Sequence, residues 1–207
     1  PPAAPPPPPA FFFQAHAVIG DPLWSRGVGD VYKRQDLHEG RGVLEDEHTV
    51  NVDGKPITAE NILIAVGGWP STPEISGVEH VISSNEALEL PSLPKRMVVV
   101  GGGYIAVEFA GIFASLGVDV TEIVRADTVL RGFDEDIRQA LDEEMSKRGV
   151  DIMSKTEIHH IEKHEDVYRL HLENNEIIET ELVMYATGRR ANTENLGLEN
   201  VGVALQD

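Results

Sequence analysis

The sequence predicts an α/β fold, with a parallel sheet in the central part of the chain and an antiparallel β-meander before it. A β-branched run at residues 97–100 leads into three consecutive glycines, and a helical pattern follows at residues 104–116. A second β-branched run at residues 118–124 comes directly after that helix, which is the order of a parallel βαβ unit. Short alternating runs around the turn signal Asp53-Gly54 predict the meander.

The composition excludes several functional classes. The 207 residues include 17 Lys and Arg against 35 Asp and Glu, so the formal net charge is −18. We expect no nucleic-acid partner, because phosphate contacts need clustered basic side chains. We expect no membrane span either, since no uninterrupted apolar run reaches the roughly 18–20 residues that a bilayer requires. The chain has no cysteine, so it contains no disulfide and no thiol nucleophile.

The first part of the chain is unlike the rest. Residues 1–9 contain seven prolines, which cannot donate backbone hydrogen bonds, and no sustained period of 2 or 3.6 follows before residue 36. We expect residues 1–36 to be disordered or not native to the domain. The alternative is a proline-rich ligand for an adaptor domain, which the lack of flanking basic anchors disfavours.

A meander and a buried strand are expected next. Residues 42–58 supply the strands of the meander. Residues 61–66 form a continuous apolar run that ends at Gly67-Gly68, as a strand buried on both faces does. A short helix at residues 85–88 lies between prolines on either side.

The glycines after the central strand stand where a dinucleotide-binding turn needs them. Gly101 permits a tight turn out of the strand, and Gly103 lets the backbone approach a pyrophosphate closely. Ala106 and Ala110 are one helical turn apart, so the helix can lie against the sheet. The helix N-terminus then faces the diphosphate with free N–H groups and the positive end of its dipole. The pattern predicts a Rossmann-like domain; the alternative is a glycine-rich turn without a ligand.

The end of the second strand selects the cofactor. NAD-binding units place Asp or Glu there to accept hydrogen bonds from the ribose 2′-OH. This chain has Arg125, with Arg131 six residues later, and two guanidiniums can hold a 2′-phosphate through charged hydrogen bonds. We therefore expect NADPH rather than NADH. The alternative is that Arg125 is a solvated strand end paired with Asp127.

A second helix and further strands complete the predicted domain. Acidic residues at 134–136 begin this helix and Gly149 ends it. Its expected buried stripe is Ile137, Leu141 and Met145. Residues 150–153 continue the parallel sheet, and residues 157–184 predict strands with a turn between them. Residues 182–186 are another buried strand.

Four histidines lie close together in the sequence. They are His159, His160, His164 and His171. The four-residue spacing of His160 and His164 suits a metal only on a helix, whereas this stretch predicts strands and turns. We therefore expect solvated hairpin histidines and no metal site.

Four segments carry a family pattern: residues 62–73 (ILIAVGGWPSTP), 98–111 (VVVGGGYIAVEFAG), 129–134 (VLRGFD) and 186–192 (ATGRRAN). Together they resemble the flavin-dependent pyridine nucleotide–disulfide oxidoreductases, and within them the glutathione reductases of bacterial and plant type. Trypanothione reductase shares much of this text and is the nearest alternative. Dihydrolipoamide dehydrogenase is disfavoured, because it resembles this chain except for an acidic residue where Arg125 stands.

The resemblance implies a role for each matching residue. Tyr104 would be an aromatic lid on the nicotinamide side of the flavin, and Glu108 would hydrogen-bond the nicotinamide carboxamide and pair with a lysine beside the flavin. The other implied cofactor contacts are, for the NADPH pyrophosphate, Gly101, Gly102, Gly103, Ile105 and Ala106; for the 2′-phosphate, Arg125 and Arg131; for the nicotinamide end, Gly188 and Arg189; and for FAD, Gly67 and Gly68.

The resemblance also implies an organisation in which much of the enzyme is missing. Residues 37–76 would be a remnant of the FAD domain, residues 77–188 the NADPH-binding domain, and residues 189–207 the start of the return to the FAD domain. Neither the redox-active CxxxxC disulfide nor the dimerisation domain with its His–Glu pair is expected in this chain. We expect the complete enzyme to be a cytoplasmic homodimer that uses NADPH and FAD to reduce oxidised glutathione. We expect this chain alone to be inactive; the alternative is a non-catalytic NADPH-binding module.

Overall fold

The computed structural model describes residues 36–205, which form two compact units. The meander unit comprises residues 36–68 and 191–205, and the sheet unit is Trp69–Arg190. The proline-rich segment lies outside the described residues. The boundaries expected from the sequence were 76/77 and 188/189. Residues 69–76 pack with the sheet unit, where the Ser71 amide donates to the Gly188 carbonyl at 3.0 Å and the Ile161 amide to the Ser76 carbonyl at 2.9 Å. The division into cofactor domains stays a prediction.

The meander unit contains the predicted antiparallel strands. They are β1 (Gly42–Asp46), β2 (Thr49–Val52) and β3 (Lys55–Thr58), in the order β1-β2-β3. The predicted turn at Asp53-Gly54 is confirmed: both residues have positive φ, and Val52 pairs with Lys55. The core of this unit is Leu44, Val50, Val52, Leu196 and Leu198, the last from the short helix η2 (Leu198–Val201).

Residues 61–66 do not form the buried strand that the sequence predicts. The segment has no strand assignment, and the side chains of Leu63 and Ile64 are 67% and 39% exposed. An apolar run on both faces is stable as a strand only where neighbouring strands accept its backbone hydrogen bonds and cover both faces. Within residues 36–205 no strand pairs with it, and only Ile62 and Val66 pack on the core of the unit.

The parallel sheet of the sheet unit confirms the predicted fold class. Its order is β11-β5-β6-β7, with every neighbouring pair parallel. The strands are β5 (Arg96–Val100), β6 (Asp119–Val124), β7 (Val150–Ser154) and β11 (Leu182–Tyr185). Before them come η1 (Val78–His80) and α2 (Ser84–Ala87), where Ser83 and Glu86 form a capping box. The strands β4 (Gly68–Pro70) and β12 (Arg189–Ala191) pair where the chain passes between the units.

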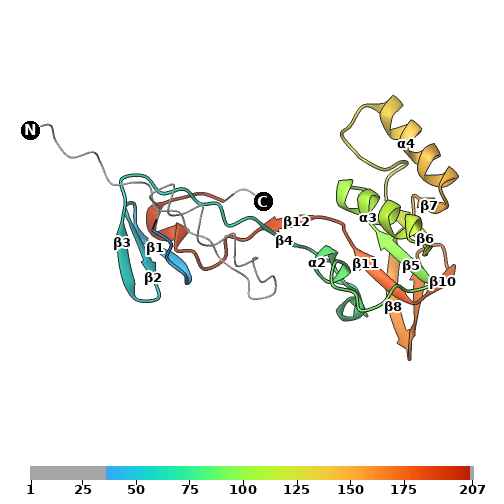
Figure 1. Ribbon diagram of the computed structural model, residues 1–207, viewed down its shortest axis with the longest axis horizontal. Helices are drawn as coiled ribbons and strands as arrows, with labels where there is room; N and C mark the ends of the chain where they lie inside the picture. Colours follow the sequence, from blue (N-terminus) through green and yellow to red (C-terminus); the bar gives the residue numbers. More distant parts are fainter. Residues whose placement is uncertain (1–35, 206–207) are drawn as a thin grey trace, which may run out of the picture. The chain divides into compact units, whose positions relative to one another are not determined.

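Three layers make up the sheet unit (Figure 1). Met97 and Val99 of β5 face the helices α3 (Tyr104–Ser115) and α4 (Glu135–Lys147). Val98 and Val100 face the opposite way, toward a second, antiparallel sheet. Its strands are β8 (Ile158–His164), β9 (Val167–Leu172) and β10 (Ile177–Thr180), in the order β10-β9-β8. Alternate residues of one central strand thus build two cores.

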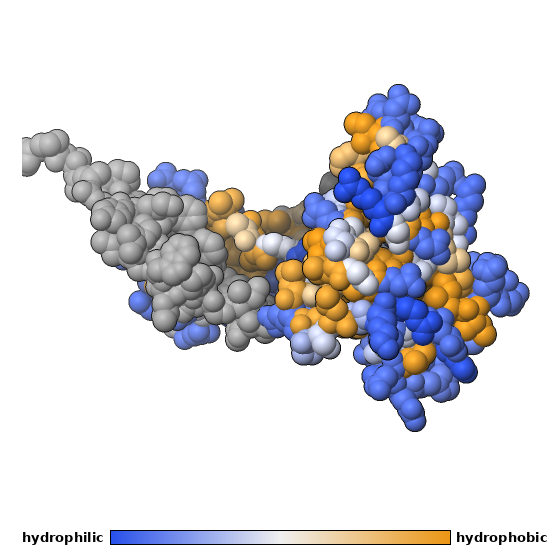
Figure 2. All heavy atoms as spheres, turned by 45° about the vertical axis from the view of Figure 1, so that its right-hand side comes forward, coloured by the Kyte–Doolittle hydropathy of each residue, from blue (hydrophilic) through white to orange (hydrophobic). Residues whose placement is uncertain are grey.

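The buried stripe of α4 is shorter than the sequence predicts. Met145 is buried and Leu141 partly so, but the side chain of Ile137 is 58% exposed. Ile137 lies in the first turn, where the side chain of Arg138 turns inward instead and its Nε donates to the Val129 carbonyl at 2.9 Å. Hydrophilic residues predominate over α4 at the top of the sheet unit in Figure 2. None of the helices in residues 36–205 has the length and apolarity needed to cross a bilayer.

Candidate dinucleotide-binding site

The turn between β5 and α3 is built so tightly that its first two residues have no room for side chains. Gly101 has φ +139°, and a Cβ atom there would lie 2.5 Å from the Ala186 carbonyl oxygen. A Cβ on Gly102 would lie 2.6 Å from Cγ1 of Val124. By contrast, a Cβ on Gly103 would meet nothing within 4 Å, so the space in front of this residue is open. The turn therefore offers a bare backbone to whatever approaches it.

The N-terminus of α3 is open to an anion. Gly103 is the N-cap residue, so no side chain caps the helix, and its first turn contains no acidic residue. The first N–H groups of a helix lack partners within it, and together with the dipole they favour a negatively charged ligand. The expectation that small residues let this helix lie on the sheet is confirmed, since Ala106 and Ala110 have no exposed surface.

Tyr104 and Glu108 share one face of α3. They are four residues apart, so their side chains are neighbours on the helix surface. Tyr104 is 61% exposed and Glu108 is also exposed. Within the described residues, neither side chain forms a hydrogen bond or an ion pair, so this face is available to a ligand or to another part of the protein.

A hydrogen bond fastens the loop that carries Arg131 to the glycine turn. The Leu130 amide donates to the Gly102 carbonyl at 2.6 Å, and Leu130 has a φ of 52°. Sequence reasoning missed this link, because a left-handed leucine gives no signal in the pattern. Arg131 follows directly and is exposed. The other predicted arginine, Arg125, follows the last residue of β6 and is exposed as well.

Both guanidiniums lack protein partners in the part of the chain that the structure describes. The sequence left open that Arg125 pairs with Asp127. In the structure Asp127 pairs with Lys155 instead, with Nζ and Oδ1 2.7 Å apart. The two arginines are therefore exposed cations in an acidic chain. β6 runs parallel to β5, so Arg125 leaves the same edge of the sheet as the turn, and Arg131 follows the Leu130 amide that bonds to the turn.

The end of β11 borders the same turn. The Ala186 amide donates to the Val100 carbonyl at 2.7 Å, which brings the following residues Thr187 and Gly188 to the carboxyl end of the sheet. Gly188 is exposed, and Arg189 begins β12. The carboxyl ends of parallel strands are where α/β sheets bind their ligands.

Gly67 and Gly68, which the resemblance implies lie beside FAD, belong to the meander unit. The Asn192 amide donates to the Gly67 carbonyl at 3.0 Å, and Gly67 has a φ of 69°. These glycines connect residues 61–66 to β4.

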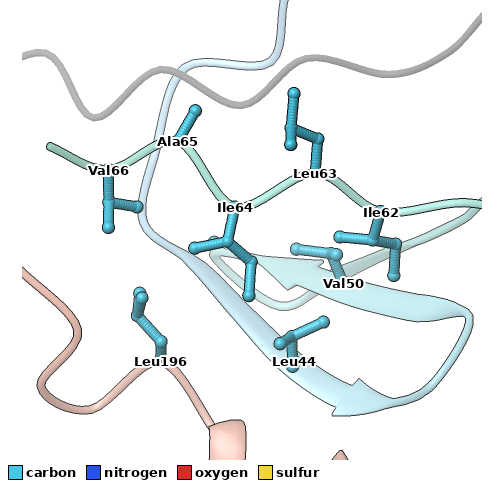
Figure 3. A pocket seen from close by; sticks show the side chains of 9 residues that line it. Leu44, Val50, Ile62, Leu63, Ile64, Ala65, Val66 and Leu196 are labelled. Atoms are coloured by element: carbon cyan, nitrogen blue, oxygen red, sulfur yellow. The ribbon is translucent and has the colours of Figure 1, made fainter. Parts of the chain in front are cut away.

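The meander unit has an apolar groove beside residues 61–66 (Figure 3). Ile62, Ile64 and Val66 point toward Val50, Leu44 and Leu196, while Leu63 and Ala65 point away. The groove is lined by Gly42, Leu44, Val50, Ile62, Leu63, Ile64, Ala65, Val66 and Leu196. These residues carry no polar side chain, so the groove holds no group for chemistry.

One carboxyl group of the sheet unit is strongly perturbed. Glu122 has no exposed surface, and neither of its side-chain oxygens has a hydrogen-bond partner within the described part of the chain. Burial, together with the negative charge of Asp142, raises the pKa of Glu122 to about 8. Glu122 lies within β6 rather than at its end, so we assign it no part in the candidate site.

A strand, a bare glycine turn and an uncapped helix, with a second strand followed by an exposed arginine, are typical of nucleotide-binding α/β units. Comparison of the sequence with known families agrees with this class. The chain belongs to the pyridine nucleotide-disulphide oxidoreductase family, whose sequence model matches residues 26–207.

Curated relatives narrow the class further. A glutathione reductase of Nostoc sp. is 45% identical over 174 residues, which cover 83% of this chain and 38% of the relative. The glutathione reductase of Pisum sativum, described as chloroplastic/mitochondrial, is 48% identical over 171 residues, or 82% of this chain and 31% of the relative. A trypanothione reductase of Trypanosoma congolense is 41% identical, over 81% of this chain and 37% of the relative. The chain thus spans less than two fifths of these relatives.

A solved structure shares the fold. The HOCl-induced flavoprotein disulfide reductase RclA from Escherichia coli superposes with a TM-score of 0.77 at 32% identity, over 84% of this chain and 40% of that one. The chain is therefore glutathione reductase-like in sequence and disulfide reductase-like in fold.

Proposed function

We propose that residues 77–188 are the NADPH-binding domain of an FAD-dependent glutathione-disulfide reductase. The observation that carries the proposal is the glycine turn before α3, bare at Gly101 and Gly102 and open at Gly103, with two arginines after β6 that have no partner among residues 36–205. This arrangement fits a dinucleotide whose ribose bears a 2′-phosphate.

Different residues near the turn would bind different parts of NADPH. The amides of residues 102–106 would bind the pyrophosphate, with Gly102 and Ile105 in backbone contact. Arg125 and Arg131 would hold the 2′-phosphate. Tyr104 and Glu108, on the exposed face of α3, would contact the nicotinamide, and Gly188 with Arg189 would cover it.

The rest of the chain would belong to the FAD domain. Residues 37–76 and 189–207 would be parts of that domain, with Gly67 and Gly68 beside the cofactor. Bound FAD and NADPH supply the redox chemistry in such an enzyme, while the protein binds and orients them. We take oxidised glutathione as the substrate of a homodimeric, cytoplasmic enzyme, by analogy with the glutathione reductases to which the chain is similar.

A second candidate is supported by one relative. The trypanothione reductase of Trypanosoma congolense is 41% identical to this chain, which favours a related disulfide substrate as the alternative. A domain that binds NADPH without turnover of its own is the other, because the chain has no cysteine.

The test is cofactor selectivity of the double variant Arg125→Gln/Arg131→Gln. Each charged hydrogen bond is worth about 1.5–3 kcal/mol, so losing two should lower NADPH affinity by about a hundredfold or more while NADH affinity stays unchanged. Calorimetry with both cofactors measures this. Arg148→Gln, at the exposed C-cap of α4, is the matched control. Equal affinity of the unmodified chain for NADPH and NADH contradicts the assignment of the two arginines.

A further inference from the structure

The solvent face of the antiparallel sheet gathers imidazoles that the sequence keeps apart. β8 and β9 pair so that His160 lies directly opposite His171. Side chains alternate along a strand, so Glu162 lies on the same face as His160. The intervening Ile161 and its partner Leu170 point into the core and are buried.

These three side chains lie within reach of a single ion. The rings of His160 and His171 are stacked, with centroids 4.0 Å apart. Glu162 places one oxygen 3.3 Å from Nε2 of His171 and the other 3.7 Å from Nε2 of His160. One ligand atom from each residue lies within 4.8 Å of the others.

We propose that His160, Glu162 and His171 bind a divalent transition-metal ion, for which Zn²⁺ is the probe. Two imidazole nitrogens and one carboxylate oxygen suit zinc or copper(II), whereas calcium and magnesium prefer oxygen ligands alone. Tetrahedral zinc, with bonds of about 2.0–2.2 Å, separates its ligands by roughly 3.3–3.6 Å. Rotation of the side chains closes the remaining gap, because the backbone already holds them in register.

The metal-binding atom of His171 is screened from water. Its Nε2 is buried, and within the described residues the Glu162 carboxylate lies 3.3 Å away without hydrogen-bond geometry, so an ion between the two groups would satisfy both. A pocket opens on this face and is lined by His159, His160, His171, Leu172, Glu173 and Asn175. Glu162 is itself exposed, so an ion can approach the three side chains from solvent.

Neighbouring histidines supply the supporting contacts that metal ligands have. A β-bulge between Ile158 and His160 inserts His159 into β8, and the Nδ1 atoms of His159 and His160 lie 2.9 Å apart. When Nδ1–H of His160 donates to Nδ1 of His159, the lone pair on Nε2 of His160 is left for an ion. His164, two residues beyond Glu162 on the same face, lies 3.3 Å from its carboxylate and is a candidate fourth ligand.

The proposal departs from the expectation that these histidines are merely solvated. That expectation weighed His160 with His164, which are near in sequence. The pair that the sheet brings together is His160 with His171, and the bulge and register that do so are not visible in the spacing.

Isothermal titration of the whole chain with ZnCl₂ in excess Mg²⁺ tests the site. We expect one Zn²⁺ per chain. His160→Asn and His171→Asn should each weaken binding at least tenfold, Glu162→Gln should weaken it less, and His48→Asn, in the meander unit, should leave it unchanged. Circular dichroism checks that the variants fold.

A second measurement needs no variant. In ¹⁵N spectra of the imidazoles, Zn²⁺ should shift the Nε2 signals of His160 and His171 and leave that of His48 in place. Absence of stoichiometric binding, or binding that survives in the double variant His160→Asn/His171→Asn, or shifts confined to other histidines, would overturn the proposal.

Discussion

Gly101 lies against Ala186 so closely that a Cβ atom on the glycine would stand 2.5 Å from the alanine carbonyl oxygen. The contact joins the end of β5 to the end of β11 at the carboxyl edge of the parallel sheet. It explains why the first position of the turn has to be glycine, independently of any ligand. The third position, Gly103, has open space instead.

The contrast between Gly101 and Gly103 predicts that alanine affects folding at the first position and cofactor binding at the second. Gly101→Ala should destabilise the chain by roughly 1–3 kcal/mol, because its φ of +139° is strained for alanine and its Cβ meets backbone. Gly103→Ala, at a φ of −87°, should leave the free energy of unfolding within about 1 kcal/mol of the unmodified value but weaken NADPH binding. Urea unfolding and cofactor titration measure the two effects. Equal loss of stability in both variants contradicts the geometry of the turn.

The buried Glu122 predicts a pH dependence of stability. Its pKa is raised from 4.5 to about 8, so the folded state keeps the proton that the unfolded state loses. The contribution of Glu122 to the free energy of unfolding is fully present below pH 4.5, where the group is protonated in both states. It is lost as the pH rises toward 8. Over that interval the free energy of unfolding should fall by about 1.4 kcal/mol per pH unit from this group alone.

Glu122→Gln removes that slope. The variant should be more stable than the unmodified chain at pH 8, and the advantage should shrink at pH 5. Urea unfolding followed by circular dichroism measures it, with Glu89→Gln on the exposed surface as control. A variant with the same pH slope as the parent shows that Glu122 is not the group responsible.

The 207-residue chain should reduce no oxidised glutathione, even with FAD and NADPH added. The proposed glutathione reductase would pass electrons to glutathione through a pair of cysteine sulfurs, and this chain has no cysteine. The assay follows NADPH absorbance with purified protein, and a full-length glutathione reductase is the positive control. Sustained oxidation of NADPH that depends on oxidised glutathione contradicts the account.

Patterns of neighbouring residues predicted the elements that depend only on neighbouring residues. The β5–α3–β6 unit and the turn at Asp53-Gly54 are specified by residues adjacent in sequence, and the structure has both. The prediction of a strand at residues 61–66 was wrong, because a strand depends on neighbouring strands that the apolar run itself does not encode. The prediction that Ile137 is buried was wrong, because the helical period does not reveal that the Arg138 side chain turns inward there.

The candidate site shows the same division. The glycines and arginines were found from their order along the chain. The Leu130 amide, which fastens the arginine loop to the turn, depends on a left-handed backbone that leucine rarely adopts. The His160–His171 pair depends on strand register and a bulge, which are set by the packing of the sheet as a whole.

The most direct test of the central claim, that the turn before α3 binds NADPH, is a ¹H–¹⁵N spectrum of the chain recorded during titration with NADPH. We expect the largest amide shifts at Gly102, Gly103 and Ile105, with further shifts at Arg125 and Arg131 that NADH does not reproduce. Saturating NADPH that leaves these amides in place, or that shifts residues of the meander unit instead, would contradict it.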